Sequence, residues 1–153
     1  MERMHTLLFL CTGNYYRSRL AEELFNHYAE AAGLDWRADS AGLSDDFEGL
    51  KAVNLHKMST TTVAYLEKRG LPIQGRNRLP REITGEDLDR ADRIIALDDE
   101  EHPPLVALRP WLHEAEIEYW DVRDLDRQTA GTATEAIDQK VKALVDDLAH
   151  PQA

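Results

Sequence analysis

The stretch LLFLCTGNYYRSRLAEELF, residues 7–25, contains the only cysteine of the chain, Cys11. An apolar run ends at this cysteine, and a helical pattern begins six residues later at Arg17. Short apolar runs are typical of strands that are buried on both faces of a parallel sheet. The stretch therefore predicts a strand, a tight loop and a helix in succession, which is the repeating unit of an α/β fold.

Three further segments resemble strands. Segments 93–97 and 117–120 are short apolar runs, and 35–40 is a weaker one. Helical patterns lie between the strand-like segments, so we expect a parallel sheet with right-handed crossovers. No repeat or linker divides the chain, and a single domain is expected over residues 1–153.

The helical patterns have recognisable ends and faces. They cover 17–32, 58–69, a stretch that opens with the capping box TGED at Thr84, and a C-terminal stripe of Ile137, Val141, Leu144, Val145 and Leu148. Residues 41–57 have no clear period, and we expect a long surface loop there. Long loops in compact domains are often functional.

Composition excludes several classes of protein. The net charge of −11 argues against nucleic-acid binding. One cysteine excludes an internal disulfide and a zinc site built from cysteines. The apolar part of the N-terminus is too short for a signal peptide, and no apolar run reaches membrane-spanning length. We expect a soluble, cytoplasmic protein that binds neither nucleic acid nor membrane.

The position of Cys11 indicates chemistry. Ligands of open α/β sheets bind beyond the carboxyl ends of the strands, where Cys11 lies. Backbone N–H groups of the following loop and helix start favour an anion, and the Arg17 guanidinium suits phosphate oxygens. The same positive field should lower the pKa of Cys11 and make it a nucleophile. A lone cysteine is usually a small buried hydrophobe. The surrounding Gly13, Asn14 and Ser18 favour function here, and Ser18 can donate a hydrogen bond to the sulfur.

At these residues the chain resembles the low-molecular-weight protein-tyrosine phosphatases. CTGNYYRS (11–18) matches the family motif C-x5-R-[ST], ADSAGL (38–43) is similar to the family's DSAGT, and 79–101 is similar to its ARxLTxEDL segment. The resemblance implies a flavodoxin-like three-layer α/β sandwich with a four-stranded parallel sheet of order 2-1-3-4, and no cofactor or metal. It also implies that Ser40 hydrogen-bonds Asn14 and supports the loop.

The resemblance implies a cysteine-dependent phosphomonoesterase that works through a phosphocysteine intermediate. Cys11, Arg17 and Asp124 would be catalytic. The phosphate would be bound by the loop residues Thr12, Gly13, Asn14, Tyr15, Tyr16, Arg17 and Ser18. The substrate would be a phosphorylated protein, carrying phosphotyrosine, or a small phosphomonoester, and the enzyme would be a monomer or weak dimer.

Two departures from the family pattern affect these expectations. Tyr16 stands where many members have a second cysteine, so that protective disulfide cannot form, and Tyr15 replaces a small or aliphatic residue; both tyrosines could narrow the pocket mouth. The segment 119–129, YWDVRDLDRQT, lacks the family's Asp-Pro. In relatives with a tryptophan at the end of the fourth strand, the acid follows four residues later, so Trp120 indicates Asp124.

Several alternatives remain open. Asp121 and Asp126 are the other candidates for the general acid. An arsenate reductase coupled to an external thiol and a non-catalytic phosphate- or phosphopeptide-binding module also fit the loop. DDEEH (98–102) resembles a metal cluster, but its acids more naturally complement a helix N-terminus. We expect the three tryptophans, Trp36, Trp111 and Trp120, to pack in or around the core.

Overall fold

The structure, a computed structural model, describes residues 4–53, 57–123 and 129–150. Four parallel strands form one sheet in the order β2-β1-β3-β4, as predicted. The elements in chain order are β1 (His5–Cys11), α1 (Arg17–Ala31), β2 (Trp36–Gly42), α2 (Phe47–Val53), α3 (Thr60–Lys68), α4 (Gly85–Arg90), β3 (Arg93–Ala96), α5 (His102–Ala107), a 3₁₀ turn η1 (Pro110–Leu112), β4 (Ile117–Tyr119) and α6 (Ala130–Ala149).

Strand β1 lies inside the sheet, and its side chains alternate between two cores. Leu7 and Phe9 belong to the core under α1 and α6, whereas Leu8 and Leu10 belong to the core on the opposite face of the sheet. All four are at most 1% exposed. Because successive side chains of a strand point to opposite faces, a strand covered on both sides must be apolar throughout. This is why the run before Cys11 has no polar alternation.

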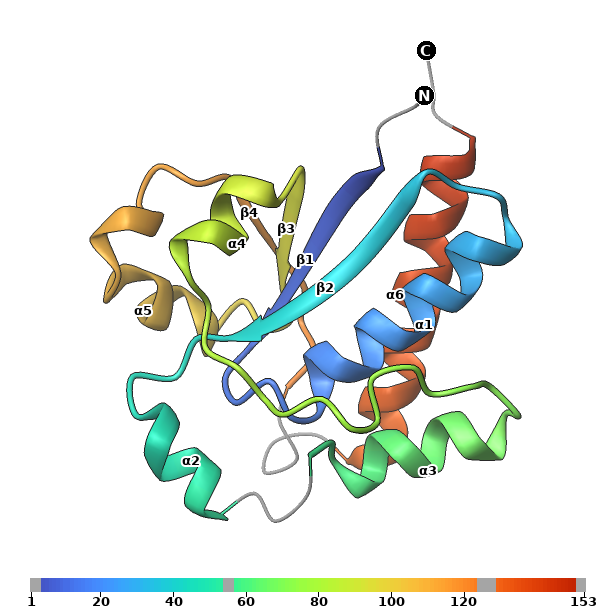
Figure 1. The fold of residues 1–153 in the computed structure, drawn as a ribbon, viewed down its shortest axis with the longest axis horizontal. Coiled ribbons are helices and arrows are strands. Elements are labelled where there is room, and N and C mark those ends of the chain that lie inside the picture. The colour runs from blue at the N-terminus through green and yellow to red at the C-terminus, as the bar shows by residue number, and fades with distance from the viewer. Residues whose placement is uncertain (1–3, 54–56, 124–128, 151–153) are drawn as a thin grey trace.

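Helices cover both faces of the sheet, which gives the predicted flavodoxin-like three-layer arrangement (Figure 1). Helices α1 and α6 pack against each other on one side, and α3 contacts both; α4 and α5 lie on the other side. The α6 stripe supplies buried Ile137 and Val141 to the core beneath α1. The predicted capping box is present, since Thr84 accepts from the Asp87 N–H and Asp87 accepts from the Thr84 N–H.

The expectation of a loop over 41–57 is wrong. Strand β2 continues to Gly42, and α2 follows at Phe47–Val53. The helix has only seven residues and contains Gly49, a poor helix former, so it leaves no apolar period in the sequence. Phe47, which is 7% exposed, anchors the start of α2 in the structure.

Two of the three tryptophans pack as expected. The Trp120 ring lies 5.6 Å from the Phe9 ring, and Trp36 stacks on His5 at 4.8 Å between ring centroids. Trp111 is 43% exposed, so the expectation of packing is wrong for this residue. It lies in the short turn η1, where the neighbouring Leu112 takes the buried position. No helix within the described ranges is long and apolar enough to cross a membrane.

Candidate active site

The loop that joins β1 to α1 is held from outside through its carbonyl groups. The Thr12 carbonyl accepts hydrogen bonds from the N–H groups of Leu43 (3.1 Å) and Ser44 (3.0 Å), and the Tyr15 carbonyl accepts one from Ser59 (2.9 Å). In a trans peptide the next N–H points opposite to the carbonyl. The N–H groups that follow Thr12 and Tyr15 therefore point into the loop, where they can bind an anion at the start of α1.

Asn14 fixes the shape of this loop. Its φ of 51° lies in the left-handed region, which asparagine tolerates better than most residues. Its Nδ2 donates to Ser18 Oγ and to Ser40 Oγ, each at 2.9 Å, and its Oδ1 accepts from Arg78 Nη1 at 3.0 Å. The Arg81 N–H also donates to Oδ1, at 3.1 Å. The Ser40 contact implied by the family resemblance is thus present, together with two arginines that the sequence did not indicate.

Cys11 lies at the base of the loop and is 3% exposed. Its Sγ lies 2.9 Å from Ser18 Oγ. Asn14 donates to that same hydroxyl oxygen, which leaves the Ser18 hydrogen available to point at the sulfur. The geometry therefore allows Ser18 to stabilise a thiolate, the form of cysteine that acts as a nucleophile.

Arg17 is 2% exposed and reaches across the loop. Its Nη1 donates to the Val122 carbonyl at 3.0 Å and pairs with Asp98 Oδ2 at 3.4 Å, and its Nη2 donates to Glu101 Oε2 at 2.7 Å. Burial raises the pKa of Asp98. The hydrogen bonds from N–H groups of the next turn and the charge of Arg123 lower this pKa by more, so its net shift is downward. An ionised Asp98 behind the guanidinium holds Arg17 in place.

Arg19 is a second buried arginine, 1% exposed, and no motif in the sequence indicated its role. It donates to the carbonyls of Gly75 (2.7 Å), Lys57 (2.9 Å), Arg78 (3.0 Å) and Asn14 (3.4 Å). Burial, with the nearby charge of Arg78, lowers the pKa of Arg19 to about 10. Its guanidinium joins the loop to two chain segments that are distant in sequence.

A third arginine, Arg78, completes the support of the loop. Its Nη2 donates to Ser40 Oγ at 2.8 Å and pairs with Glu22 Oε1 at 3.1 Å, and Ser40 Oγ donates to Glu22 at 2.5 Å. Burial raises the pKa of Glu22, and the charge of Arg78 opposes that rise. Residues from α1, β2 and the segment before α4 thereby hold Asn14 from one side.

The segment DDEEH contributes to the site rather than to a metal centre. Besides Arg17, the Glu101 carboxylate accepts from Thr12 Oγ1, and His102 Nε2 lies 3.1 Å from Glu101 Oε2 and 3.2 Å from Thr12 Oγ1. As expected, the acids precede a helix, since α5 begins at His102 and Glu101 is its N-cap residue. The contact of Glu101 with Arg17 was not expected. Within the part of the chain that the structure describes, no group of three or more His, Cys, Asp or Glu side chains could hold a metal ion.

The general acid remains a sequence prediction. Asp124 and Asp126 lie outside the described residues. Asp121 is described, and its Oδ1 pairs with Lys140 Nζ at 3.0 Å. The hydrogen bond and charge of Lys140 lower the pKa of Asp121, so this exposed carboxylate is held in the ionised form. A proton donor must carry its proton at the working pH, which makes Asp121 the poorer candidate.

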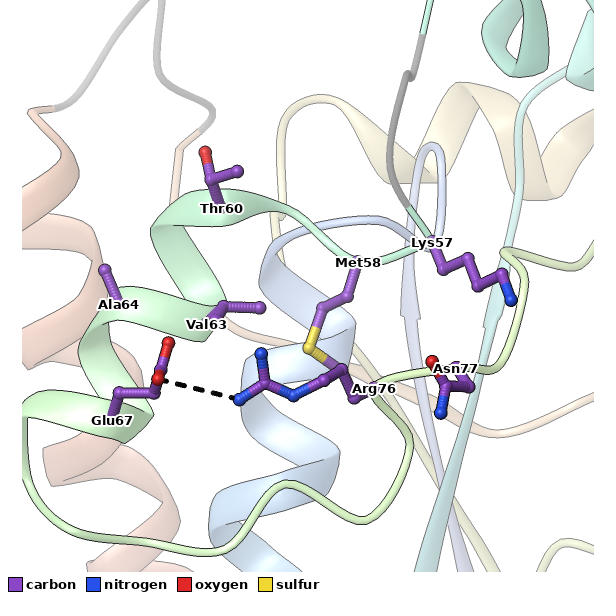
Figure 2. A pocket seen from close by; sticks show the side chains of 8 residues that line it. All are labelled: Lys57, Met58, Thr60, Val63, Ala64, Glu67, Arg76 and Asn77. Atoms are coloured by element: carbon purple, nitrogen blue, oxygen red, sulfur yellow. Dashed lines mark ion pairs between the residues drawn. The ribbon is translucent and has the colours of Figure 1, made fainter.

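The two tyrosines of the loop differ in their surroundings. Tyr16 is 6% exposed and packs in the core under α1, so its ring does not cover the pocket mouth as considered above. Tyr15 is half-buried. A groove of about 470 Å³ lies between α3 and the segment around Arg76, and Arg76 pairs with Glu67 at 3.8 Å. Figure 2 shows the side chains that line this groove.

Comparison with known proteins relates the chain to three bacterial proteins. YfkJ of Bacillus subtilis, a low molecular weight protein-tyrosine-phosphatase, is 36% identical over 99 residues, which are 63% of this chain and 58% of YfkJ. A putative low molecular weight protein-tyrosine-phosphatase of Synechocystis is 34% identical, covering 68% of this chain and 62% of that protein. A protein-arginine-phosphatase of Bacillus subtilis is 30% identical, covering 66% and 60%.

These alignments span less than two thirds of the curated relatives' own lengths. The crystal structure of YfkJ superimposes more fully, with a TM-score of 0.77 and 25% identity over 99% of both chains. A model of the family described as low molecular weight phosphotyrosine protein phosphatase matches residues 6–152. The chain therefore belongs to the low molecular weight phosphotyrosine protein phosphatase family.

Proposed function

We propose that the chain is a cysteine-dependent phosphomonoesterase that forms a phosphocysteine intermediate on Cys11. The observation that carries this proposal is the pairing of Cys11 Sγ with Ser18 Oγ at 2.9 Å in a loop closed by buried Arg17. Such a loop can hold the three equatorial oxygens of a phosphoryl group while the sulfur attacks phosphorus in line.

The first step forms the sulfur–phosphorus bond and breaks the bond between phosphorus and the leaving oxygen. The leaving oxygen takes a proton from the general acid, which we assign to Asp124. In the second step water attacks phosphorus, the carboxylate accepts the water proton, and the sulfur departs as a thiolate. Ser18 stabilises that thiolate, and inorganic phosphate is released.

We propose phosphotyrosine on a protein, or a small phosphomonoester, as substrate. The family membership supports this class, and the relatives named as phosphatases act on phosphorylated groups. The expectations of a cytoplasmic location and of a monomer or weak dimer stay predictions, as does a single domain over residues 1–153.

The arsenate reductase alternative has weaker support. Relays through internal disulfides need further cysteines, and Cys11 is the only one in the chain. Only a version coupled to an external thiol would fit. A non-catalytic phosphate- or phosphopeptide-binding module remains the second alternative, because the segment 119–129 lacks the family's Asp-Pro.

One experiment separates these functions. We expect the purified protein to hydrolyse p-nitrophenyl phosphate in the presence of a chelator, and Cys11→Ser to reduce that turnover to background while inorganic phosphate still binds. A serine hydroxyl has no adjacent base in the described loop to activate it. Substantial turnover by Cys11→Ser contradicts the covalent mechanism. Arsenate reduction with small thiols but no phosphatase activity supports the reductase, and phosphate binding without either activity supports the module.

A further inference from the structure

A carboxylate contacts the arginine to which the proposed function assigns the phosphoryl group. Glu101 Oε2 accepts from Arg17 Nη2 at 2.7 Å and from Thr12 Oγ1. The opposite nitrogen of the guanidinium, Nη1, is engaged by the Val122 carbonyl and by Asp98 behind the loop. Glu101 therefore bonds the guanidinium to which the proposed function assigns the phosphoryl oxygens, through Nη2.

We propose that Glu101 competes with the phosphoryl group for Arg17, so that the site binds free phosphate weakly and expels it after hydrolysis. The proposal rests on the phosphatase function above and adds a residue that sets phosphate affinity and product release. A dianion entering the loop must displace the carboxylate, and the carboxylate must return when the product leaves. A Glu side chain can do this by rotamer changes alone.

The charge state of Glu101 fits this role. Burial raises the pKa of Glu101, but the hydrogen bond from His102, the charge of Arg17 and the hydrogen bond from Thr12 lower it more. The net pKa is well below its usual range, so the competitor is an anion at neutral pH. Like charges near one guanidinium repel, and a neutral side chain of the same size would remove that repulsion.

His102 offers the displaced carboxylate a second partner. This histidine is fully buried, and its Nδ1 accepts a hydrogen bond from the Asp98 N–H at 3.1 Å. The ring hydrogen must therefore be on Nε2, which lies 3.1 Å from Glu101 Oε2. Glu101 can release Arg17 while keeping the His102 hydrogen bond.

The test compares Glu101→Gln with the matched control Glu100→Gln. Glu100 is the neighbouring acid on the same turn; it pairs with Arg123 at 3.4 Å, and its side chain is half exposed. Both variants remove one negative charge, but only Glu101→Gln removes a charge that contacts Arg17. The readouts are the dissociation constant for inorganic phosphate, measured by titration followed by ³¹P NMR, and the inhibition constant of phosphate against p-nitrophenyl phosphate.

We expect Glu101→Gln to bind phosphate about 10-fold more tightly than wild type, a change that one unit of charge near a partly buried site can produce. Glu100→Gln should stay within about twofold, as expected for an exposed charge. Unchanged or weaker phosphate binding by Glu101→Gln, in a protein that melts like wild type, overturns the proposal, because it means that Glu101 only positions Arg17. An equal gain in both variants also overturns it, since the effect is then one of net charge. If no variant hydrolyses the ester, the proposed function fails, and the NMR titration still decides the role of Glu101.

Discussion

The planar guanidinium of Arg17 donates to Asp98, Val122 and Glu101, and in the proposed function the same plane presents donors to phosphate. Lysine keeps the charge but has no second arm, so Arg17→Lys cannot hold Val122 and a phosphoryl oxygen together. We expect kcat to fall by about 10²–10³-fold, the usual effect of losing one donor to a developing oxyanion. Steady-state kinetics with p-nitrophenyl phosphate measure the loss.

The control for Arg17→Lys is Arg37→Lys, at an exposed residue of β2 that bonds Gln74. It should leave kcat unchanged. A near-normal kcat in Arg17→Lys would contradict phosphate recognition by the loop, provided that both variants melt at the wild-type temperature.

The predicted role of Asp124 as general acid can be tested by changing the leaving group. We expect Asp124→Asn to lower kcat by about 10²–10⁴-fold for an alkyl phosphate, whose leaving oxygen needs a proton. The loss should be much smaller for p-nitrophenyl phosphate. The basic limb of the pH profile should flatten, because that limb reports the protonated acid.

Asp121→Asn is the matched comparison, since Asp121 is held ionised by Lys140. It should change neither the leaving-group dependence nor the basic limb. If Asp121 or Asp126 shows the pattern and Asp124 does not, the assignment through Trp120 is wrong.

Among the elements, the end of β2 is packed directly against the loop that joins β1 to α1. A Cβ added at Gly42 would lie 2.6 Å from the Phe47 ring, 2.8 Å from the Thr12 carbonyl oxygen and 3.3 Å from the Asn14 N atom. Two of these atoms are backbone atoms of the loop, which cannot move without moving the site. Gly42 is the last residue of β2, and only a residue without a Cβ fits at this position.

We predict that Gly42→Ala destabilises the protein by about 1–3 kcal/mol, the usual cost of overpacking, and also lowers kcat. Gly85→Ala is the control, because a Cβ at Gly85 would meet no atom within 4 Å and Gly85 begins a helix. It should be neutral or slightly stabilising. Urea unfolding and steady-state kinetics check both, and a Gly42→Ala protein with normal kcat would show that the loop can absorb the clash.

Across the whole molecule, one buried carboxylate joins the three helices on one side of the sheet. Asp138 of α6 accepts from the Tyr28 hydroxyl of α1 and from the Tyr65 hydroxyl of α3, each at 2.6 Å. Burial and these hydrogen bonds raise the pKa of both tyrosines, so both remain donors over the working range of pH. Arg69 Nε lies 3.7 Å from the same carboxylate.

We predict that Asp138→Ala lowers the free energy of unfolding by about 2–4 kcal/mol, because two tyrosine hydroxyls lose their acceptor inside the protein. Gln139→Ala, at the exposed neighbouring position of α6, should change it by less than about 0.5 kcal/mol. Urea denaturation gives both values, and equal effects would show that Asp138 is not the common acceptor that the structure describes.

The sequence by itself determined the order of the four strands and of helices α1, α3, α4 and α6, the capping box of α4 and the position of Cys11 between a strand and a helix. These features depend on residues close together in the chain, such as the apolar run of β1 and the stripe on α6. The sheet order and the Ser40 contact came from the resemblance to a family, and the structure confirms both. Helix α2 was not predicted, because a helix of seven residues with buried Phe47 at its start leaves no helical period of apolar residues in the sequence.

Only the tertiary structure decided which charged residues surround the loop. Arg78 lies 64 residues from Asn14, and Glu101 lies 84 residues from Arg17 and 89 from Thr12. No local pattern in the sequence indicated these contacts. The sequence predicted that Glu101 is one of several acids at the start of a helix. The fold also brings its carboxylate within hydrogen-bond distance of Arg17. The physical reason is that parallel strands bring their carboxyl ends to one edge, so residues after β1 and β3 become neighbours through crossovers that no local pattern records.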